Sequence, residues 1–163
     1  YWHKSERREF RGYTTDVFFR EAMAWMDREH AAGRPFFCYL PTAAPHGPLN
    51  VPQKYRDAVR PRVEAALPGQ PKKGAGAREG LVRFLAMIEN IDENLGKLEE
   101  FLERKGLREN TVMIYLTDNG STMGQNYYPA GMRGAKVTLW EGGHREPSIA
   151  YWPGRIRPQQ VSR

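Results

Sequence analysis

A long amphipathic stretch separates two short apolar runs, and this order constrains the fold more than any other feature of the sequence. Residues 79–105 carry apolar side chains at helical spacing, and Gly106 follows as a natural helix stop. The apolar runs at 36–40 (FFCYL) and 111–116 (TVMIYL) are typical of buried strands. Strands separated by helices favour a parallel arrangement. The sequence therefore predicts an α/β fold with a mostly parallel sheet flanked by helices.

The remaining segments extend this pattern. Apolar residues at helical spacing between Thr14 and Gly33 predict a further helix. Residues 148–152 predict a third strand. Residues 60–78 contain three prolines and three glycines, a composition that predicts a surface loop. At 163 residues the chain is long enough for one domain with a real core.

Composition narrows the possible partners. The formal net charge of +6 would suit an anionic ligand, but the basic residues are interspersed with acids, glycines and prolines. Because no basic stripe forms along one helical face, the sequence predicts no nucleic-acid binding. No apolar run approaches the length that a membrane span needs. The single cysteine, Cys38, allows no internal disulfide.

The loop after residue 40 contains a candidate histidine. In open α/β sheets, ligands bind beyond the carboxyl ends of the strands. The segment Ala44-Pro45-His46-Gly47-Pro48 follows the first apolar run, and its two prolines restrict the backbone around His46. An imidazole can transfer a proton near neutral pH or bind a metal or an anion. The alternative is a histidine in a rigid surface loop.

The loop after residue 116 contains a candidate oxygen-donor pair. In Thr117-Asp118-Asn119-Gly120, the carboxylate and the amide carbonyl are hard donors suited to Ca²⁺ or Mg²⁺. Asp-Asn-Gly is also turn chemistry, although residues 121–125 show no second strand to complete a hairpin. The residues alone leave site and turn open. Because His46 and Asp118 each follow an apolar run, we expect both at the same edge of one sheet.

A third, glycine-rich segment contains Lys136. Residues 133–147 combine glycines, which allow close backbone approach to a ligand, with basic side chains, which neutralise an anionic ester. The alternative is an ordinary loop with solvated charges. Cys38 has no neighbouring base within its apolar run, so we predict a buried, unreactive thiol rather than a nucleophile.

Taken in series, these segments resemble the sulfatases of the alkaline-phosphatase-like superfamily. The resemblance covers most of residues 12–156, and the segments that carry it occur in the order of that family at 35–48, 89–96, 117–120, 131–147 and 151–154. The resemblance implies an incomplete alkaline-phosphatase-like α/β fold. Residues 1–163 would then be part of a single sulfatase catalytic domain, truncated at both ends.

The resemblance also implies roles for four residues. Asp118 and Asn119 would be metal ligands for Ca²⁺, or for Mg²⁺ in its place. His46 and Lys136 would be the catalytic and substrate-binding residues that contact the sulfate group or the ester oxygen. The cation and the lysine would offset charge on the sulfuryl oxygens, and a protonated His46 would help the alcohol depart. The substrate would be a sulfated small molecule or carbohydrate, and the family-level location is periplasmic or secreted.

Two departures from the family pattern concern the nucleophile and the lysine loop. The family nucleophile is a formylglycine made from a cysteine, with Pro or Ala two residues later and Arg four residues later. Leu40 and Thr42 stand at these positions after Cys38. The nucleophile is therefore expected upstream, and the 163-residue piece alone should lack sulfatase activity. Val137 stands where a glycine commonly follows the lysine.

Two alternatives to a sulfuric ester hydrolase remain open. A phosphodiesterase or phosphonate hydrolase of the same superfamily would share the metal geometry. A non-catalytic scaffold could have kept the fold after losing the nucleophile. The upstream nucleophile segment would distinguish them, whereas the sequence does not set the substrate alcohol or the oligomeric state.

Overall fold

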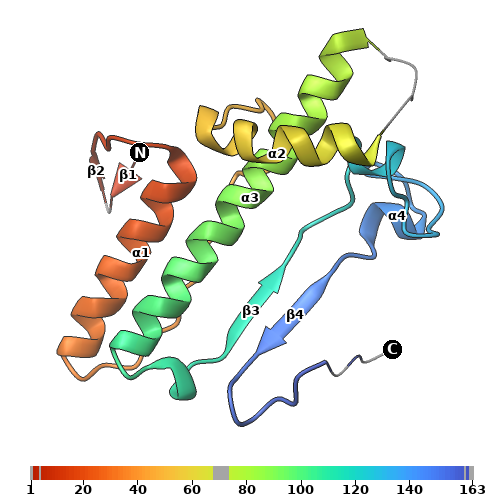
Figure 1. Cartoon of the computed structure of the whole chain (residues 1–163). Helices are drawn as coiled ribbons and strands as arrows, with labels where there is room; N and C mark the ends of the chain where they lie inside the picture. Colours follow the sequence, from red (N-terminus) through yellow and green to blue (C-terminus); the bar gives the residue numbers. More distant parts are fainter. Residues whose placement is uncertain (1, 4, 68–73, 160, 162–163) are drawn as a thin grey trace. The chain divides into compact units, whose positions relative to one another are not determined.

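The computed structural model describes two compact units (Figure 1). The first unit comprises Tyr1–Phe101 and the second Leu102–Arg163. Within these units the described residues are 2–3, 5–67, 74–159 and 161. Of the helices formed by the described residues, none has both the length and the apolar character needed to cross a bilayer.

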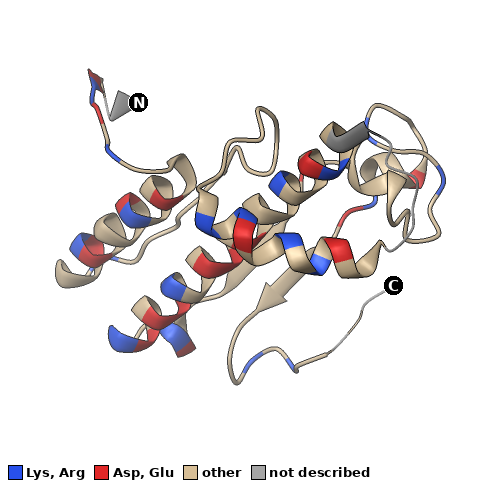
Figure 2. Ribbon diagram, turned by 45° about the horizontal axis from the view of Figure 1, so that its top comes forward, with Lys and Arg blue, Asp and Glu red and all other residues tan. Residues whose placement is uncertain are grey.

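Three helices make up most of the first unit. Helices α1 (Thr14–Ala31) and α3 (Gly74–Arg104) lie side by side, while α2 (Gln53–Ala66) crosses α3 (Figure 1). Before α1, the short strands β1 (Trp2–His3) and β2 (Glu6–Arg7) pair antiparallel. The predicted first helix is confirmed. Acidic and basic residues are interspersed along all three helices (Figure 2), as the scattered charges in the sequence indicated.

The core of the first unit consists of apolar side chains from these helices. On α2, buried residues recur every four positions, which produces one apolar stripe. On α3, burial confirms the predicted apolar face at Leu81 and Leu98, whereas Ile88 is exposed. The buried apolar residues of the unit are Val17, Phe19, Met26, Tyr55, Val59, Val63, Leu81, Val82, Ala86, Met87, Ile91, Leu98 and Phe101.

The predicted surface loop over residues 60–78 is wrong at both of its ends. Helix α2 continues to Ala66 with Pro61 inside it, and α3 begins at Gly74. Residues 68–73 of the predicted loop lie outside the described residues. Proline in a helix interior costs about 3 kcal/mol. Burial of Val59 and Val63 offsets this cost, because each fully buried valine contributes roughly 1.5–3 kcal/mol.

The second unit contains a pair of strands joined by a long loop. Strand β3 (Met113–Leu116) pairs antiparallel with β4 (Ser148–Tyr151). The shorter elements of the unit are η1 (Arg108–Asn110), η2 (Gly124–Asn126) and α4 (Glu141–His144). The element order predicted a mostly parallel sheet, but this described pair runs antiparallel. A parallel return needs a crossover connection that is usually a helix, and α4 has only four residues.

The apolar run at 36–40 forms no strand within the described part of the chain. Its exposure nevertheless alternates, with Phe36 and Cys38 half-buried but Phe37 86% and Tyr39 78% exposed. On the inner side, the Phe36 ring packs edge-on against Trp25 of α1, with centroids 5.8 Å apart. The predictions of a buried strand and of a buried Cys38 are therefore wrong. The side chains that face α1 are partly covered, whereas Phe37 and Tyr39 remain exposed.

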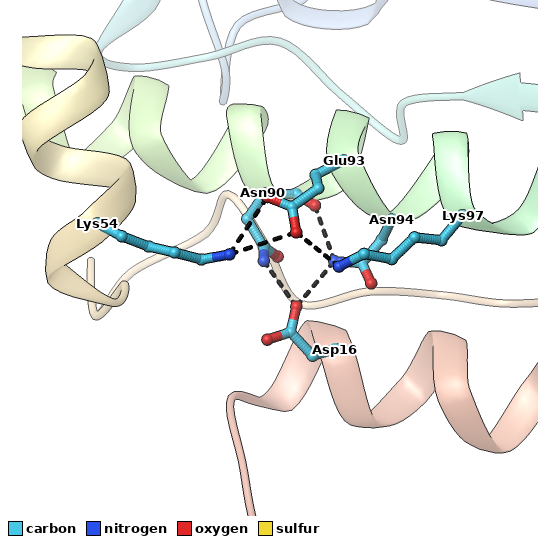
Figure 3. Close-up of polar contacts among 6 residues, drawn as sticks. All are labelled: Asp16, Lys54, Asn90, Glu93, Asn94 and Lys97. Atoms are coloured by element: carbon cyan, nitrogen blue, oxygen red, sulfur yellow. Dashed lines mark hydrogen bonds and ion pairs between the residues drawn. The ribbon is translucent and has the colours of Figure 1, made fainter.

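A buried hydrogen-bond network joins α1 to α3 (Figure 3). Asn90 and Asn94 of α3 both donate from Nδ2 to the same oxygen of Asp16, at 2.7 and 2.8 Å. Asn94 also donates to the carbonyl oxygen of Asn90 at 2.8 Å. Asn90 is 0% exposed and Asn94 2% exposed. Because buried amides need partners, the network sets how α1 and α3 align.

The first prediction concerns this network. Asp16→Ala removes the acceptor that Asn90 and Asn94 share, and it should lower the free energy of unfolding by about 1–3 kcal/mol because buried donors lose their partner. Urea unfolding of the chain measures the change. Asp92→Ala, at an exposed carboxylate on α3, is the matched control and should change stability by less than about 0.5 kcal/mol. Equal effects of the two variants would contradict the prediction.

A second prediction concerns the contribution of Glu93 to the free energy of unfolding at low pH. Hydrogen bonding from Lys97, at 2.6 Å, is the largest cause that lowers the pKa of Glu93 to about 2, with smaller contributions from Tyr55 and Lys54. A carboxyl with a lowered pKa stabilises the fold above its unfolded pKa of 4.5, and this contribution disappears as the pH falls toward 2. Since the side chain is 37% exposed, solvent screening keeps the effect small, about 1 kcal/mol or less.

Glu93→Gln should therefore destabilise the chain at neutral pH, and the difference from the native sequence should shrink below pH 4.5. Urea unfolding across this pH range measures it. A difference that stays constant down to pH 2 would show that the ion pairs of Glu93 do not contribute.

Candidate functional site

His46 lies in a tight turn of the first unit. Its backbone N–H donates to the carbonyl oxygen of Ala43 at 2.9 Å, and Thr42 donates from its hydroxyl to the carbonyl of Ala44 at 3.2 Å. The imidazole is exposed, and Nδ1 lies 2.9 Å from the carbonyl oxygen of Gly47. Only a protonated Nδ1 can donate to this carbonyl, so Nε2 is left available to bind or transfer a proton.

Asp118 and Asn119 follow directly after β3 in the second unit. Asp118 is exposed, and the Nδ2 group of Asn119 donates to its carboxylate. This contact leaves the amide oxygen of Asn119 and the second carboxylate oxygen of Asp118 as two hard donors with no cationic partner among the described residues. The donor pair suits Ca²⁺ or Mg²⁺.

The pair is nevertheless only part of a cation site. Calcium takes about six to eight oxygen ligands. No group of three or more His, Cys, Asp or Glu residues within the described ranges could hold a metal ion. Asp118 and Asn119 therefore fit as two contributors to a larger oxygen-rich site.

The hairpin-turn interpretation of Asp118-Asn119-Gly120 does not match the structure. The strand that pairs with β3 begins only at Ser148, after a long loop. Instead of closing a two-residue turn, the N–H of Gly120 donates to the carbonyl oxygen of Gly143 at 3.1 Å. The backbone N–H of this segment therefore forms a contact between two loops and does not close a hairpin.

Lys136 lies in a loop that is closed at its base. The N–H of Gly142 donates to the carbonyl oxygen of Arg133 at 2.9 Å, and the Arg133 guanidinium lies 3.5 Å from the ring centroid of Trp140. Within the loop, the hydroxyl of Thr138 donates to the carbonyl of Ala135 at 2.7 Å. The half-buried Lys136 forms no hydrogen bond or ion pair with a described residue. Its ammonium group is therefore available to an anion.

Val137 adopts a backbone conformation that suits glycine. Its φ angle is +71°, in the left-handed region, and its side chain is 94% exposed. A β-branched residue is strained in this region, whereas glycine is not. The positive φ angle explains why a glycine commonly follows the lysine in the family that the sequence resembles.

The Asp118-Asn119 loop and the Lys136 loop meet backbone to backbone. A β-carbon on Gly120 would lie 2.0 Å from the carbonyl oxygen of Gly142, and one on Gly142 would lie 2.3 Å from that of Gly134. The structure therefore brings the loop of Asp118 and Asn119 into contact with the loop of Lys136, so three of the four predicted site residues lie on touching loops. His46 belongs to the first unit, so its predicted place beside Asp118 stays a prediction.

Two features of the site were missed from the sequence. The sequence analysis assigned the glycines of residues 133–147 to close approach to a ligand and Gly120 to a turn, but Gly120 and Gly142 approach each other. The hydroxyl of Thr117 donates to the carboxylate of Glu146 at 2.9 Å, a contact that no local pattern indicates. The repeated glycines between β3 and β4 were the sequence signal for this close approach of the two loops.

Cys38 is not set up as a nucleophile. It is a half-buried free thiol, and burial raises its pKa. A higher pKa means less thiolate near neutral pH, and the thiolate is the reactive form. The raised pKa agrees with the low reactivity that the sequence predicts for Cys38, and that low reactivity stays a prediction.

Known proteins provide an independent comparison. The family model described as Sulfatase matches residues 1–163. The N-acetylgalactosamine-6-sulfatase of Canis lupus familiaris is 34% identical over 152 residues, which are 91% of this chain and 25% of that protein. The ulvan-active sulfatase of Formosa agariphila is 29% identical over 164 residues, 99% of this chain and 30% of that protein.

A solved structure extends the similarity to the fold. Ps i-CgsB in complex with k-i-k-neocarrahexaose has a TM-score of 0.77 and 26% identity, over 94% of this chain and 31% of that chain. The likeness confirms the predicted class, an incomplete α/β domain of the alkaline-phosphatase-like fold. The chain spans 25% to 31% of the length of these relatives.

A third prediction concerns Val137. Val137→Gly should raise the free energy of unfolding by about 1 kcal/mol, because relief of left-handed strain, roughly 1–3 kcal/mol, outweighs the extra unfolded-state entropy of glycine. The exposed side chain loses no packing. Val137→Ala is the control, since it keeps a β-carbon and most of the strain. Urea unfolding compares the three chains, and a destabilised glycine variant would contradict the prediction.

Proposed function

The chain belongs to the sulfatase family, and from this premise we propose that the whole protein hydrolyses sulfate esters. The observation that carries the proposal is the backbone contact between the Asp118-Asn119 loop and the Lys136 loop. The contact joins a loop with an oxygen-donor pair to a loop whose ammonium group has no partner among the described residues. A divalent cation and a lysine together suit a substrate whose transferred group carries several anionic oxygens.

Asp118 and Asn119 would hold the cation through one carboxylate oxygen and one amide oxygen. We propose Ca²⁺, with Mg²⁺ as the alternative, because both prefer hard oxygen ligands. When bound, the cation would offset negative charge on the sulfuryl group.

Lys136 and His46 would act on the two ends of the ester. The Lys136 ammonium would bind a sulfate oxygen, because no described residue neutralises it. His46 would bind the ester oxygen through Nε2 and protonate the departing alcohol, since its Nδ1 faces the carbonyl of Gly47. Cys38 lacks the motif of the family nucleophile, so the formylglycine of the proposed reaction would lie outside these 163 residues.

The substrate proposed here is a sulfated carbohydrate. Three similar proteins support this class by their names: an N-acetylgalactosamine-6-sulfatase, an ulvan-active sulfatase and a protein solved with k-i-k-neocarrahexaose. The half-buried Lys136 fits a ligand that is recognised by its anionic group.

The fourth prediction tests the function at Asp118. In the whole protein, Asp118→Ala should lower the turnover of an aryl sulfate by about two orders of magnitude or more and weaken Ca²⁺ binding, because the cation loses an anionic ligand worth several kcal/mol. Turnover assays and calorimetric titration with Ca²⁺ measure both effects. Asp92→Ala is the matched control at an exposed carboxylate of α3.

The 163-residue chain provides a separate check. Two ligands make a poor site, so the isolated chain should bind Ca²⁺ only weakly. Tight binding by the chain that Asp118→Ala abolishes would show that the site is complete within it. Unchanged turnover and metal content in the mutated whole protein would remove the proposed function.

A further inference from the structure

Two contacts flank the Asp118-Asn119 pair, one on each side. Before the pair, the hydroxyl of Thr117 donates to the carboxylate of Glu146 at 2.9 Å. After the pair, the N–H of Gly120 donates to the carbonyl oxygen of Gly143 at 3.1 Å. The two acceptors lie within or just after α4, at the end of the loop that carries Lys136. We call these contacts the hydroxyl clamp and the amide clamp.

The amide clamp is held by shape as well as by its hydrogen bond. Gly120 and Gly143 are both buried. A β-carbon on Gly143 would lie 2.2 Å from the carbonyl oxygen of Thr138, so this glycine is enclosed by the lysine loop itself. Because the carbonyl of Gly142 also fills the space above Gly120, a side chain at Gly120 would force the end of β3 away from α4.

The hydroxyl clamp uses a carboxylate that has no other described partner. Glu146 forms no ion pair with a described residue, and the adjacent Arg145 pairs with Glu141 at 3.3 Å. Both Thr117 and Glu146 are half-buried. At 2.9 Å the contact has the length of an ordinary O–H···O hydrogen bond. This carboxylate therefore serves the Thr117 contact rather than a surface salt bridge.

The base of the lysine loop transmits these contacts to Lys136. Gly142 is joined to Arg133 by a hydrogen bond, and Arg133 is stacked on Trp140, so the two ends of the loop are fixed to each other. A shift at the end of β3 would therefore act on α4 and on the base of the loop that carries Lys136.

We propose that Thr117, Glu146 and Gly120 are positioning residues, which hold the Asp118-Asn119 oxygens and the Lys136 ammonium as one preorganised unit. The proposal rests on the proposed function, because only a cation and an anionic substrate would require these oxygens and this ammonium group to be held together. Holding both loops before the substrate arrives removes an ordering cost from the binding and reaction steps. The residues act through the loops and need not touch the substrate.

The decisive variants alter only the hydroxyl clamp. Thr117→Val removes the donor at nearly constant volume, while Thr117→Ser keeps a hydroxyl. Thr111→Val is the matched control, because the hydroxyl of Thr111 donates to the carbonyl oxygen of Leu107 at 2.8 Å just before the other end of β3. A general loss of stability in the second unit would affect the Thr111 and Thr117 valine variants alike.

The readouts in the whole protein are the Ca²⁺ dissociation constant, measured without substrate, and kcat and KM for an aryl sulfate. Thr117→Val should raise the dissociation constant about tenfold and lower kcat by about 10–100-fold, the usual effect of removing a residue that orients a metal ligand. Thr117→Ser should recover both values, and Thr111→Val should leave both near those of the native protein. Equal effects of the two valine variants, or no effect of Thr117→Val, would overturn the proposal.

Amide hydrogen exchange separates this proposal from the proposed function. Thr117→Val should speed exchange at the Gly120 amide, whereas Thr111→Val should not, whatever reaction the protein catalyses. If Asp118→Ala leaves turnover unchanged, the function fails while this exchange result still supports the clamp. If Thr117→Val leaves Gly120 exchange unchanged, the clamp fails even where the function holds.

Discussion

At Gly120 the second unit has no space for a side chain, and the arrangement of its loops depends on this constraint. A β-carbon there would lie 2.0 Å from the carbonyl oxygen of Gly142, so any other residue would push the end of β3 away from α4. Two contacts require the end of β3 to lie this close to α4: the hydrogen bond from Gly120 to Gly143 and the one from Thr117 to Glu146. The candidate cation ligands and Lys136 are thus brought together by backbone contacts of glycine, and not by direct contact between their own side chains.

The first unit depends on a polar contact inside a helical core. Asp16 accepts from Asn90 and Asn94, and both amides are almost completely buried. Apolar contacts alone would allow α1 and α3 to slide along each other, whereas in a misaligned pair the buried Asn90 and Asn94 amides would lose their shared acceptor. The segment that leads to His46 packs on the same scaffold, because Phe36 lies against Trp25 of α1.

The apolar segments show where local patterns mislead about burial. Residues 36–40 and β3 are apolar on both sides, a pattern typical of strands covered by layers on both faces. In this chain Phe37, Tyr39, Ile114 and Leu116 are exposed. The matching segment makes up 31% of the chain of the solved relative Ps i-CgsB, so the similarity concerns only part of a larger domain. Local pattern correctly predicted strand β3 but not its exposure, because burial depends on which elements surround a segment.

The sequence by itself determined the elements whose signal is local. Helical periodicity predicted α1 and most of α3, and short strand-like runs predicted β3 and β4. Oxygen-donor chemistry made Asp118 and Asn119 candidate ligands, but their roles and that of Lys136 stay proposals. Only the tertiary structure decided the rest. It extended α2 over a proline-containing segment by burying Val59 and Val63, made β3 and β4 antiparallel, and joined Asp16 to Asn90 across 74 positions and Thr117 to Glu146 across 29. Side-chain periodicity records preferences over a few neighbouring residues, whereas these contacts form only after distant segments have packed, so no local pattern contains them.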